Sequence, residues 1–564
     1  MSEPRMQWKK SLWYSLTILL LVFLAFYIGY SSYYIVYKLT PYLPNWKAIL
    51  GLLLNFLILF LELLSTFYSI FIYYFIGSSS SYRILKDENN KYLASSPLPK
   101  VAIIIPLYKE PLKVVSKTID GALKLDYPHD RYDVIVCDDS PSDISTDIKD
   151  YCDDKGVRFI QRESRKGFKA GALNNVLQQI DCDFFGVLDS DHIPTPNFIR
   201  TCLAGFTDDD VVIVQGKPMF VNQEDYLMRS SSFIHTQFFH IYQKSRGTRD
   251  GVIFAGTTGM FRTEILRKFG GLLEDTLAED TDTSFMLMSK GYKTRYIHEI
   301  CSNGLVPWNP ISMINQVCRW TNGITSIFRK RFFKILRGKN SIINKIDATS
   351  TILTPIIGVT MWFVYLLLFV MYMLSEQTLG GIIEFKFLRP DLGQISFVGL
   401  FAPILISIAS LVMAFVSWRR ESKEDRMIKL RGFFGMIWTI AAFYILMMVA
   451  QSFLIWAVLS ALIGVKKEFD RTVKEKTRTI GKMSQKIKYA LWSFGLFLIS
   501  GAYFYATYHA FFISGSFLSG WFIIAAITAL IPIIITITHF RKLEAMHEIA
   551  ATTTAADIQD ESGD

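Results

Sequence analysis

Hydrophobic residues follow two different patterns along this chain of 564 residues. Nearly continuous apolar blocks occupy both ends, at about residues 12–37, 49–76, 349–374, 395–418, 432–465, 489–512 and 517–539. A helix needs about 20 apolar residues to cross the hydrocarbon core of a bilayer. The pattern therefore predicts an α-helical polytopic membrane domain, interrupted between about residues 99 and 344.

The central stretch carries short β-branched runs, VAIII, DVIVCDD and FFGVLDSD, separated by helical and turn-rich segments. Buried parallel strands read as apolar runs that alternate with helices. We expect an α/β domain over residues 96–345, preceded by two membrane helices in 1–95 and followed by a membrane region over 346–540. The polar residues 541–564 predict a disordered tail.

Basic residues predict the topology of the membrane blocks. They precede the first block and are concentrated in two late loops, 419–431 and 466–488. Because positively charged loops stay in the cytosol, we expect the N-terminus, both loops and the α/β domain to be cytosolic. The block 432–465 is too short for two spans, so it predicts an interfacial or re-entrant helix and leaves six spans. One long tilted span is the alternative.

Composition mainly excludes other classes of protein. Lys and Arg number 60 against 50 Asp and Glu, but the basic residues cluster beside hydrophobic blocks, so no nucleic-acid partner is expected. The six cysteines lie between the blocks without CxxC spacing, which indicates reduced thiols rather than a metal site. A transporter would carry polar residues within its spans, and these blocks contain almost none.

Acidic residues gather at the ends of the predicted strands. The pair Asp138-Asp139 ends one strand, the run from Asp189 to His192 ends another, and Glu279-Asp280 follows later. Ligands of parallel α/β sheets bind beyond the carboxyl ends of the strands. Carboxylates there could hold a divalent cation that neutralises a leaving diphosphate. A single Asp-x-Asp is equally typical of a solvated strand end, so the coincidence of several motifs matters.

Together these motifs resemble the family 2 glycosyltransferases, and within them the processive cellulose synthase-like enzymes. The resemblance covers about residues 101–474 and rests on eight elements in family order: VAIIIPLYKE, VCDDS, KGFKAGALN, LDSDHIP, FAGTTGMF, LAEDTD, QVCRW and FDRTVK. Ala278 stands where the family commonly has threonine, which leaves the acid after it in place. The resemblance implies a GT-A type, Rossmann-like glycosyltransferase domain inserted in the membrane domain.

The resemblance also implies roles for individual residues. Asp280 would be the general base, and Mg²⁺ or Mn²⁺ would be held by Asp189, Asp191 and His192. The nucleotide would be bound by Tyr108, Glu110, Asp138 or Asp139, Lys169 and Arg319. The acceptor sugar would be bound by Glu279, Gln316 and Trp320. A gating loop would close over the donor through Phe469, Arg471, Thr472 and Lys474, with Arg471 where valine is usual.

Two of these elements have a second interpretation. The segment 311–333 mixes apolar and basic residues, which is also typical of a helix along the membrane face with an interfacial tryptophan. The FDRTVK loop could be held near anionic headgroups by its charge alone. The acidic motifs upstream favour the functional interpretation of QVCRW, and the loop stays open between the two.

The expected function is a processive, inverting glycosyltransferase of the plasma membrane. It would use a cytosolic nucleotide-diphosphate sugar, with UDP-glucose favoured, and extend a β-linked, cellulose-like polysaccharide that leaves through its own membrane channel. Its partners would be the sugar donor, the growing polysaccharide and the bilayer. A non-processive transferase with a lipid acceptor is the alternative, and a transporter with a nucleotide-regulated domain ranks below both. The sugar, the linkage and whether the enzyme is an oligomer stay open.

Overall fold

The computed structural model describes residues 70–223, 226–307, 310–375 and 453–465, together with the single positions 18, 22, 29, 60, 439, 447 and 450. Contacts divide the chain into two compact units. The sheet, the helices around it and residues 454–465 belong to the first unit. The second unit includes the end of the helix at residues 342–375, from residue 363 onward.

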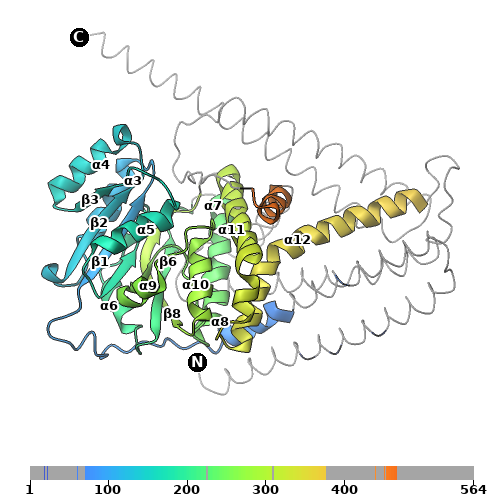
Figure 1. Ribbon diagram of the computed structural model, residues 1–564, viewed down its shortest axis with the longest axis horizontal. Coiled ribbons are helices and arrows are strands. Elements are labelled where there is room, and N and C mark those ends of the chain that lie inside the picture. The colour runs from blue at the N-terminus through green and yellow to red at the C-terminus, as the bar shows by residue number, and fades with distance from the viewer. Residues whose placement is uncertain are drawn as a thin grey trace, which may run out of the picture. The chain divides into compact units, whose positions relative to one another are not determined.

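One mixed sheet forms the centre of the described domain, in the strand order β3-β2-β1-β4-β7-β6-β8-β5 (Figure 1). Strands β3, β2, β1 and β4 are mutually parallel, and β7 is antiparallel to both of its neighbours. The strands are β1 Val101–Leu107, β2 Tyr132–Asp138, β3 Arg158–Gln161, β4 Phe184–Val187, β5 Ile193–Pro194, β6 Val211–Phe220, β7 Gly259–Arg262 and β8 Lys293–Gly304. The predicted parallel strands are confirmed as β1, β2 and β4.

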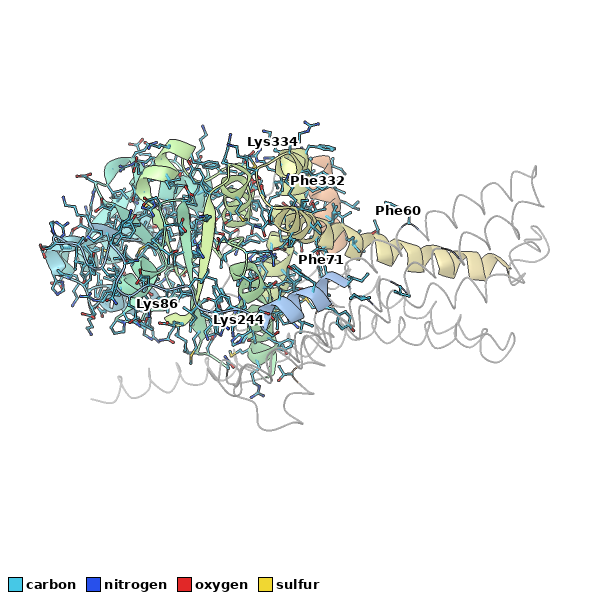
Figure 2. All side chains as sticks on the ribbon, turned by 90° about the horizontal axis from the view of Figure 1, so that it is seen from below. Phe60, Phe71, Lys86, Lys244, Phe332 and Lys334 are labelled. Carbon is cyan, nitrogen blue, oxygen red and sulfur yellow. The ribbon has the colours of Figure 1, made fainter. Side chains whose placement is uncertain are left out.

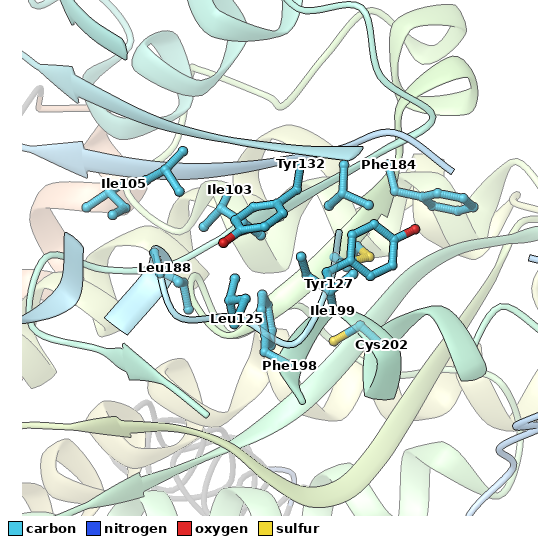
Figure 3. Close-up of a cluster of buried hydrophobic side chains, with 14 of the residues drawn as sticks. Ile103, Ile105, Leu125, Tyr127, Tyr132, Phe184, Leu188, Phe198, Ile199 and Cys202 are labelled. Carbon is cyan, nitrogen blue, oxygen red and sulfur yellow. The ribbon is translucent and has the colours of Figure 1, made fainter. Parts of the chain in front are cut away.

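Helices cover both faces of the sheet because successive strand residues point to opposite sides. On one face, Ile103 and Ile105 of β1 pack with Ile119, Phe198 and Cys202 (Figure 3). Burying one such large side chain stabilises the fold by about 1.5–3 kcal/mol. The helices of this face are α3 Leu112–Ala122, α4 Ser142–Lys155 and α6 Phe198–Ala204, and the 3-10 turn η3 His129–Arg131 precedes β2.

The opposite face is covered by α5, α9 and α10. Ile104 of β1 packs there with Leu173, Leu266 and Leu287, one residue from each of these helices. The bounds are α5 Phe168–Gln179, α9 Thr263–Phe269 and α10 Glu279–Ser289. Acidic residues fill the first turn of α10, where the positive end of the helix dipole favours negative charge.

A second group of helices lies at the end of the sheet that carries the acidic motifs (Figure 1). They are α7 Tyr226–Gln237, the π-helical turn η4 Phe238–Gln243, α8 Lys244–Gly247, α11 Pro310–Leu336 and α12 Ile342–Ser375. Residues 70–79 and 453–463 are also helical. The end of α11 exposes basic and apolar side chains, among them Phe333 at 67 %, close to the labelled Phe332 and Lys334 (Figure 2).

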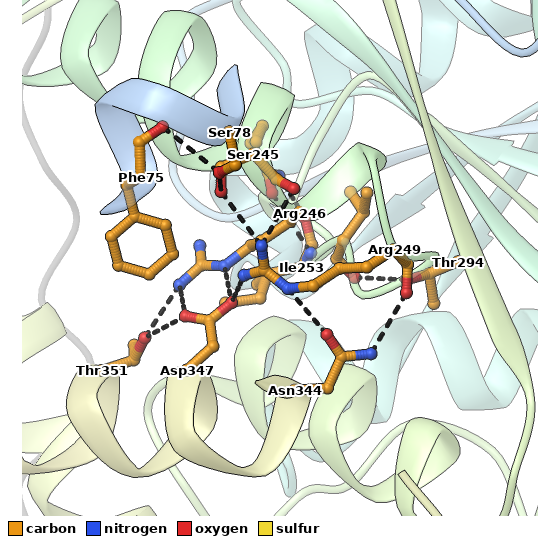
Figure 4. Close-up of polar contacts among 12 residues, drawn as sticks. Phe75, Ser78, Ser245, Arg246, Arg249, Ile253, Thr294, Asn344, Asp347 and Thr351 are labelled. Carbon is orange, nitrogen blue, oxygen red and sulfur yellow. Dashed lines mark hydrogen bonds and ion pairs between the residues drawn. The ribbon is translucent and has the colours of Figure 1, made fainter. Parts of the chain in front are cut away.

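A buried ion-pair cluster joins three segments distant in sequence (Figure 4). Arg246 of α8 contacts both carboxylate oxygens of Asp347 of α12, each at 3.0 Å. Arg249 also pairs with Asp347, and its Nη1 donates to Ser245 Oγ at 3.0 Å. Ser245 in turn contacts Ser78 of the helix 70–79. Both Arg246 and Asp347 expose only 3 % of their side chains, so this cluster fixes the start of α12 to the sheet domain.

The predicted α/β fold is confirmed for the central domain. Among the described residues, no helix combines the length and the apolar character of a membrane span. The blocks predicted at 12–37, 395–418, 489–512 and 517–539 fall outside the described ranges, apart from isolated positions. The predicted membrane domain and tail therefore stay predictions.

Candidate active site

A cavity of about 370 Å³ opens at the carboxyl ends of β1, β2 and β4. Its wall comes from the loops after these strands, the turn before β7, the start of α10, and the helices α7 and α11. The predicted residues that line it are Tyr108, Glu110, Asp139, Lys169, Asp189, Asp191, His192, Glu279, Asp280, Gln316, Arg319 and Trp320. The fold thus brings Tyr108 and Trp320, which are 212 positions apart in the sequence, to the same cavity.

Asp189, Asp191 and His192 form a cluster whose potential ligand atoms all lie within 4.8 Å of one another. Asp191 and His192 are buried, and the backbone N–H of Leu305 donates to Asp191 Oδ2 at 3.2 Å. Two carboxylates suit Mg²⁺ or Mn²⁺, and an added imidazole is tolerated better by Mn²⁺. The donor set therefore fits a divalent cation, with no preference fixed between the two metals.

Lys169 lies between this cluster and the start of α10, where Glu279 and Asp280 lie. It lies in the first turn of α5, pairs with Asp189 and donates to the carbonyl of Gly256 at 2.7 Å. Gly256 has φ of +82°, and a Cβ there would lie 3.1 Å from Asp280 Oδ2. A glycine is required because the turn needs a left-handed residue and Asp280 fills the space beside it.

Two adjacent carboxylates begin α10. Burial raises the pKa of Glu279 to about 7, with the charge of Asp280 adding to the rise. Burial also raises the pKa of Asp280, against the hydrogen bond from the backbone N–H of Thr281. Burial lowers the pKa of the facing Arg319, an effect opposed by the charges of Glu279, Asp189 and Asp280. A carboxylate with a raised pKa is a suitable proton acceptor near neutral pH.

Residues 102–270 match the family model described as glycosyl transferase family 2. These residues therefore form a domain of the glycosyl transferase family 2 type. The cellulose synthase catalytic subunit of Pseudomonas fluorescens is 31 % identical over 237 residues, which are 41 % of this chain and 32 % of that protein. Glucomannan 4-beta-mannosyltransferase 7 of Arabidopsis thaliana is 29 % identical over 265 residues, 45 % of this chain and 48 % of that protein.

This chain therefore matches about a third of the length of the cellulose synthase relatives. A solved mannosyltransferase from Pyrobaculum calidifontis, in complex with GDP-Man and Mn²⁺, aligns with a TM-score of 0.43 at 16 % identity, covering 72 % of this chain and all of that one. The family match over residues 102–270 confirms the glycosyltransferase domain that the motifs predicted.

Two neighbouring acids at the carboxyl end of β2 have different surroundings. Asp139 lines the cavity and pairs with Arg162, whose Nε donates to Oδ1 at 2.6 Å. Asp138 is fully buried and accepts from Ser140 N and Ser145 Oγ, each at 2.8 Å. Asp138 thus builds the turn from β2 to α4, and Asp139 remains the candidate for the nucleoside.

Aromatic residues form the opposite end of the cavity. The ring centres of Trp320 and His235 lie 5.6 Å apart, and the two ring planes are nearly perpendicular, at 89°. The ring of His235 stacks on that of Phe220 with 4.3 Å between their centres. Gln316 lies one helical turn before Trp320 on α11 and is buried. The predicted acceptor residues are therefore brought together with Glu279 around one space.

Several residues that line the cavity were not predicted from the sequence. The Arg165 guanidinium lies 3.3 Å above the ring centre of Tyr108, and His235, Phe220 and Phe238 line the aromatic end. Arg165 falls just before the KGFKAGALN motif, so its position in a basic loop was the available signal. The gating-loop residues Phe469, Arg471, Thr472 and Lys474 lie outside the described residues.

Proposed function

We propose that this chain is a processive, inverting hexosyltransferase that polymerises a β-linked polysaccharide from a nucleotide-diphosphate sugar. The observation that carries the proposal is the single cavity in which the Asp189–Asp191–His192 cluster, the cations Lys169 and Arg319, the Asp280 carboxylate and Trp320 meet. Each group would have a place in a sugar transfer from a diphosphate.

The nucleotide end would bind the donor. Tyr108, Glu110 and Asp139 would hold the nucleoside, and Lys169 and Arg319 would contact the diphosphate through charge-assisted hydrogen bonds. Asp189, Asp191 and His192 would hold Mg²⁺ or Mn²⁺, which when bound supplies positive charge to the departing diphosphate. UDP-glucose is the favoured donor, because cellulose synthase relatives are named as UDP-forming.

Asp280 would take the proton from the acceptor hydroxyl. The hydroxyl oxygen then forms a bond to the anomeric carbon from one face of the sugar, while the bond to the diphosphate oxygen breaks on the other face, which inverts the configuration. The proton ends on the Asp280 carboxylate and the bonding electrons leave with the nucleotide diphosphate. Trp320 would offer its apolar ring to the C–H face of the acceptor sugar, with Glu279 and Gln316 binding its hydroxyls.

The membrane context belongs to the same proposal. The sequence supports a multi-pass protein of the plasma membrane with a cytosolic catalytic domain, whose C-terminal helices would carry the polymer outward. The loop 466–488 would close over the bound donor. Such a route would also keep the growing product bound to the enzyme between additions.

A donor panel tests the proposal. Membranes that contain the full chain are incubated with labelled UDP-glucose, UDP-N-acetylglucosamine and GDP-mannose, and the product is sized and digested with linkage-specific hydrolases. A long β-linked glucan from UDP-glucose is expected. A long mannan from GDP-mannose would replace the sugar and keep the mechanism, whereas a single sugar on an extracted lipid would refute processivity.

A further inference from the structure

Thr258 adopts a backbone conformation that its side chain disfavours. Its φ is +57°, in the left-handed region that β-branched residues rarely enter. Thr258 N donates to the carbonyl of Val187 at 2.8 Å, and Gln215 Nε2 donates to the carbonyls of Thr257 at 2.9 Å and Thr258 at 3.1 Å. Backbone strain of about 1–3 kcal/mol persists only where the surroundings enforce it, and it gathers at functional sites.

The strained conformation places the Thr258 hydroxyl behind the predicted metal cluster. Thr258 Oγ1 lies 2.6 Å from Ser302 Oγ at the end of β8 and 3.4 Å from His192 Nδ1. Ser302 Oγ lies 3.2 Å from the same ring nitrogen. Thr258 and Ser302 are both fully buried. Two hydroxyls thus meet one nitrogen of an imidazole that is itself buried.

These hydroxyls continue to a second member of the cluster. Thr257 Oγ1 lies 3.5 Å from Thr258 Oγ1 and accepts the backbone N–H of Asp189 at 2.9 Å. Hydrogen bonds can run in one direction along this chain, from His192 Nδ1–H to Ser302, from Ser302 to Thr258, and from Thr258 to Thr257. In that direction the imidazole is neutral with its proton on Nδ1, and Nε2 keeps the lone pair that a metal requires.

The end of β8 also packs against the imidazole directly. A Cβ on Gly304 would lie 2.4 Å from His192 Cε1 and 2.5 Å from Nε2, so the backbone of Gly304 touches the ring. The next residue, Leu305, donates its N–H to Asp191 at 3.2 Å. One strand end therefore orients His192 through Ser302 and Gly304, and Asp191 through Leu305.

We propose that Thr258 and Ser302 are positioning residues for the divalent cation, which fix the tautomer and the orientation of His192. The inference rests on the proposed function, in which Asp189, Asp191 and His192 hold the cation. Outer partners of metal ligands typically change metal affinity by about 10–100-fold. Neither hydroxyl needs to touch the metal or the sugar for this effect.

The test measures Mn²⁺ affinity of the purified full chain with saturating UDP, from the electron paramagnetic resonance signal of free Mn²⁺. Thr258→Val and Ser302→Ala remove one hydroxyl each, and Thr258→Val keeps the β-branched shape. Each should weaken Mn²⁺ binding about 10–100-fold at an unchanged melting temperature. Thr258→Ser retains the hydroxyl and should bind Mn²⁺ like the wild type.

Two further variants separate this inference from the proposed function. His192→Ala and Asp191→Asn should abolish measurable Mn²⁺ binding, and full binding by both would overturn the metal site itself. If these two lose Mn²⁺ while Thr258→Val and Ser302→Ala bind it normally, the site stands and the positioning role is wrong. Should Thr258→Val fail to fold, Ser302→Ala alone decides, because Ser302 has no backbone strain to disturb.

Discussion

Asp280→Asn should keep donor binding and remove the proton acceptor. Asparagine has the same shape as aspartate, and its side-chain oxygen can still accept the N–H of Thr281. Asp280 lies outside the Asp189–Asp191–His192 cluster, so metal and nucleotide contacts should persist. The amide cannot take a proton at neutral pH, and transfer must then use a weaker base.

The expected loss of turnover in Asp280→Asn follows from the proposed role of Asp280 as the general base. General-base assistance contributes about 100–10,000-fold to rate, which corresponds to about 2.7–5.4 kcal/mol in the activation barrier. Burial raises the pKa of Asp280, so the wild-type carboxylate is protonated at a higher pH than an ordinary aspartate with a pKa of about 3.9. Wild-type turnover should therefore fall as pH falls through this raised pKa, and the variant should lose that dependence.

The assay is initial turnover at saturating donor, with donor affinity measured separately by titration of UDP. Asp282→Asn is the matched control, because Asp282 follows on the same helix, is fully buried 3.4 Å from Arg331 and does not line the cavity. It should change the melting temperature more than the rate. The hypothesis is refuted if Asp280→Asn loses donor affinity but keeps its rate. Loss of turnover in Glu279→Gln alone would move the base to Glu279.

Three other predictions concern the metal, the fold and the topology. EDTA should abolish synthesis and Mg²⁺ or Mn²⁺ should restore it, because the leaving diphosphate needs charge neutralisation; full activity after thorough stripping would contradict this. Asp347→Asn should cost about 3–5 kcal/mol of stability, since it breaks a buried ion pair, while the Asp209→Asn control removes only an exposed pair with Lys91 and should leave the melting temperature unchanged; equal melting temperatures of the two variants would argue against a structural role. Cysteines introduced by Arg426→Cys and Lys476→Cys should resist an impermeant maleimide on intact cells, and strong labelling of either would exclude a cytosolic loop.

The parts of the site that could be predicted share a local signal. Apolar runs ending in acids placed Asp139 and Asp189 at strand ends, because parallel strands present their carboxyl ends at one edge. The acidic first turn of α10 and the basic, aromatic α11 were visible as motifs for a similar reason. Each of these residues differs from its neighbours in the sequence in charge or in aromatic character.

The other residues of the site do not differ from their sequence neighbours in this way. Asp138 and Asp139 are adjacent and identical in type, and only the hydrogen bonds from Ser140 and Ser145 assign Asp138 to the turn. Phe220 ends an apolar strand and His235 lies in a helix of mixed polar and apolar residues, and neither pattern indicates whether the side chain faces a core or a cavity. The role proposed for Thr258 rests on its positive φ and on its contact with Ser302, 44 positions away. Neither can be read from the sequence.

Ala278 shows how a departure from the family pattern can be absorbed by its neighbours. A Cβ on Gly323 of α11 would lie 2.6 Å from the N of Ala278 and 2.7 Å from its Cβ. The backbone of α11 at Gly323 therefore packs directly on Ala278, the residue before Glu279 and Asp280. Because α11 also carries Arg319 and Trp320, this close contact sets the distance between the acceptor end of the cavity and the Asp280 carboxylate. Small residues on both sides, Ala278 and Gly323, thus allow α11 to approach the start of α10, where Glu279 and Asp280 lie.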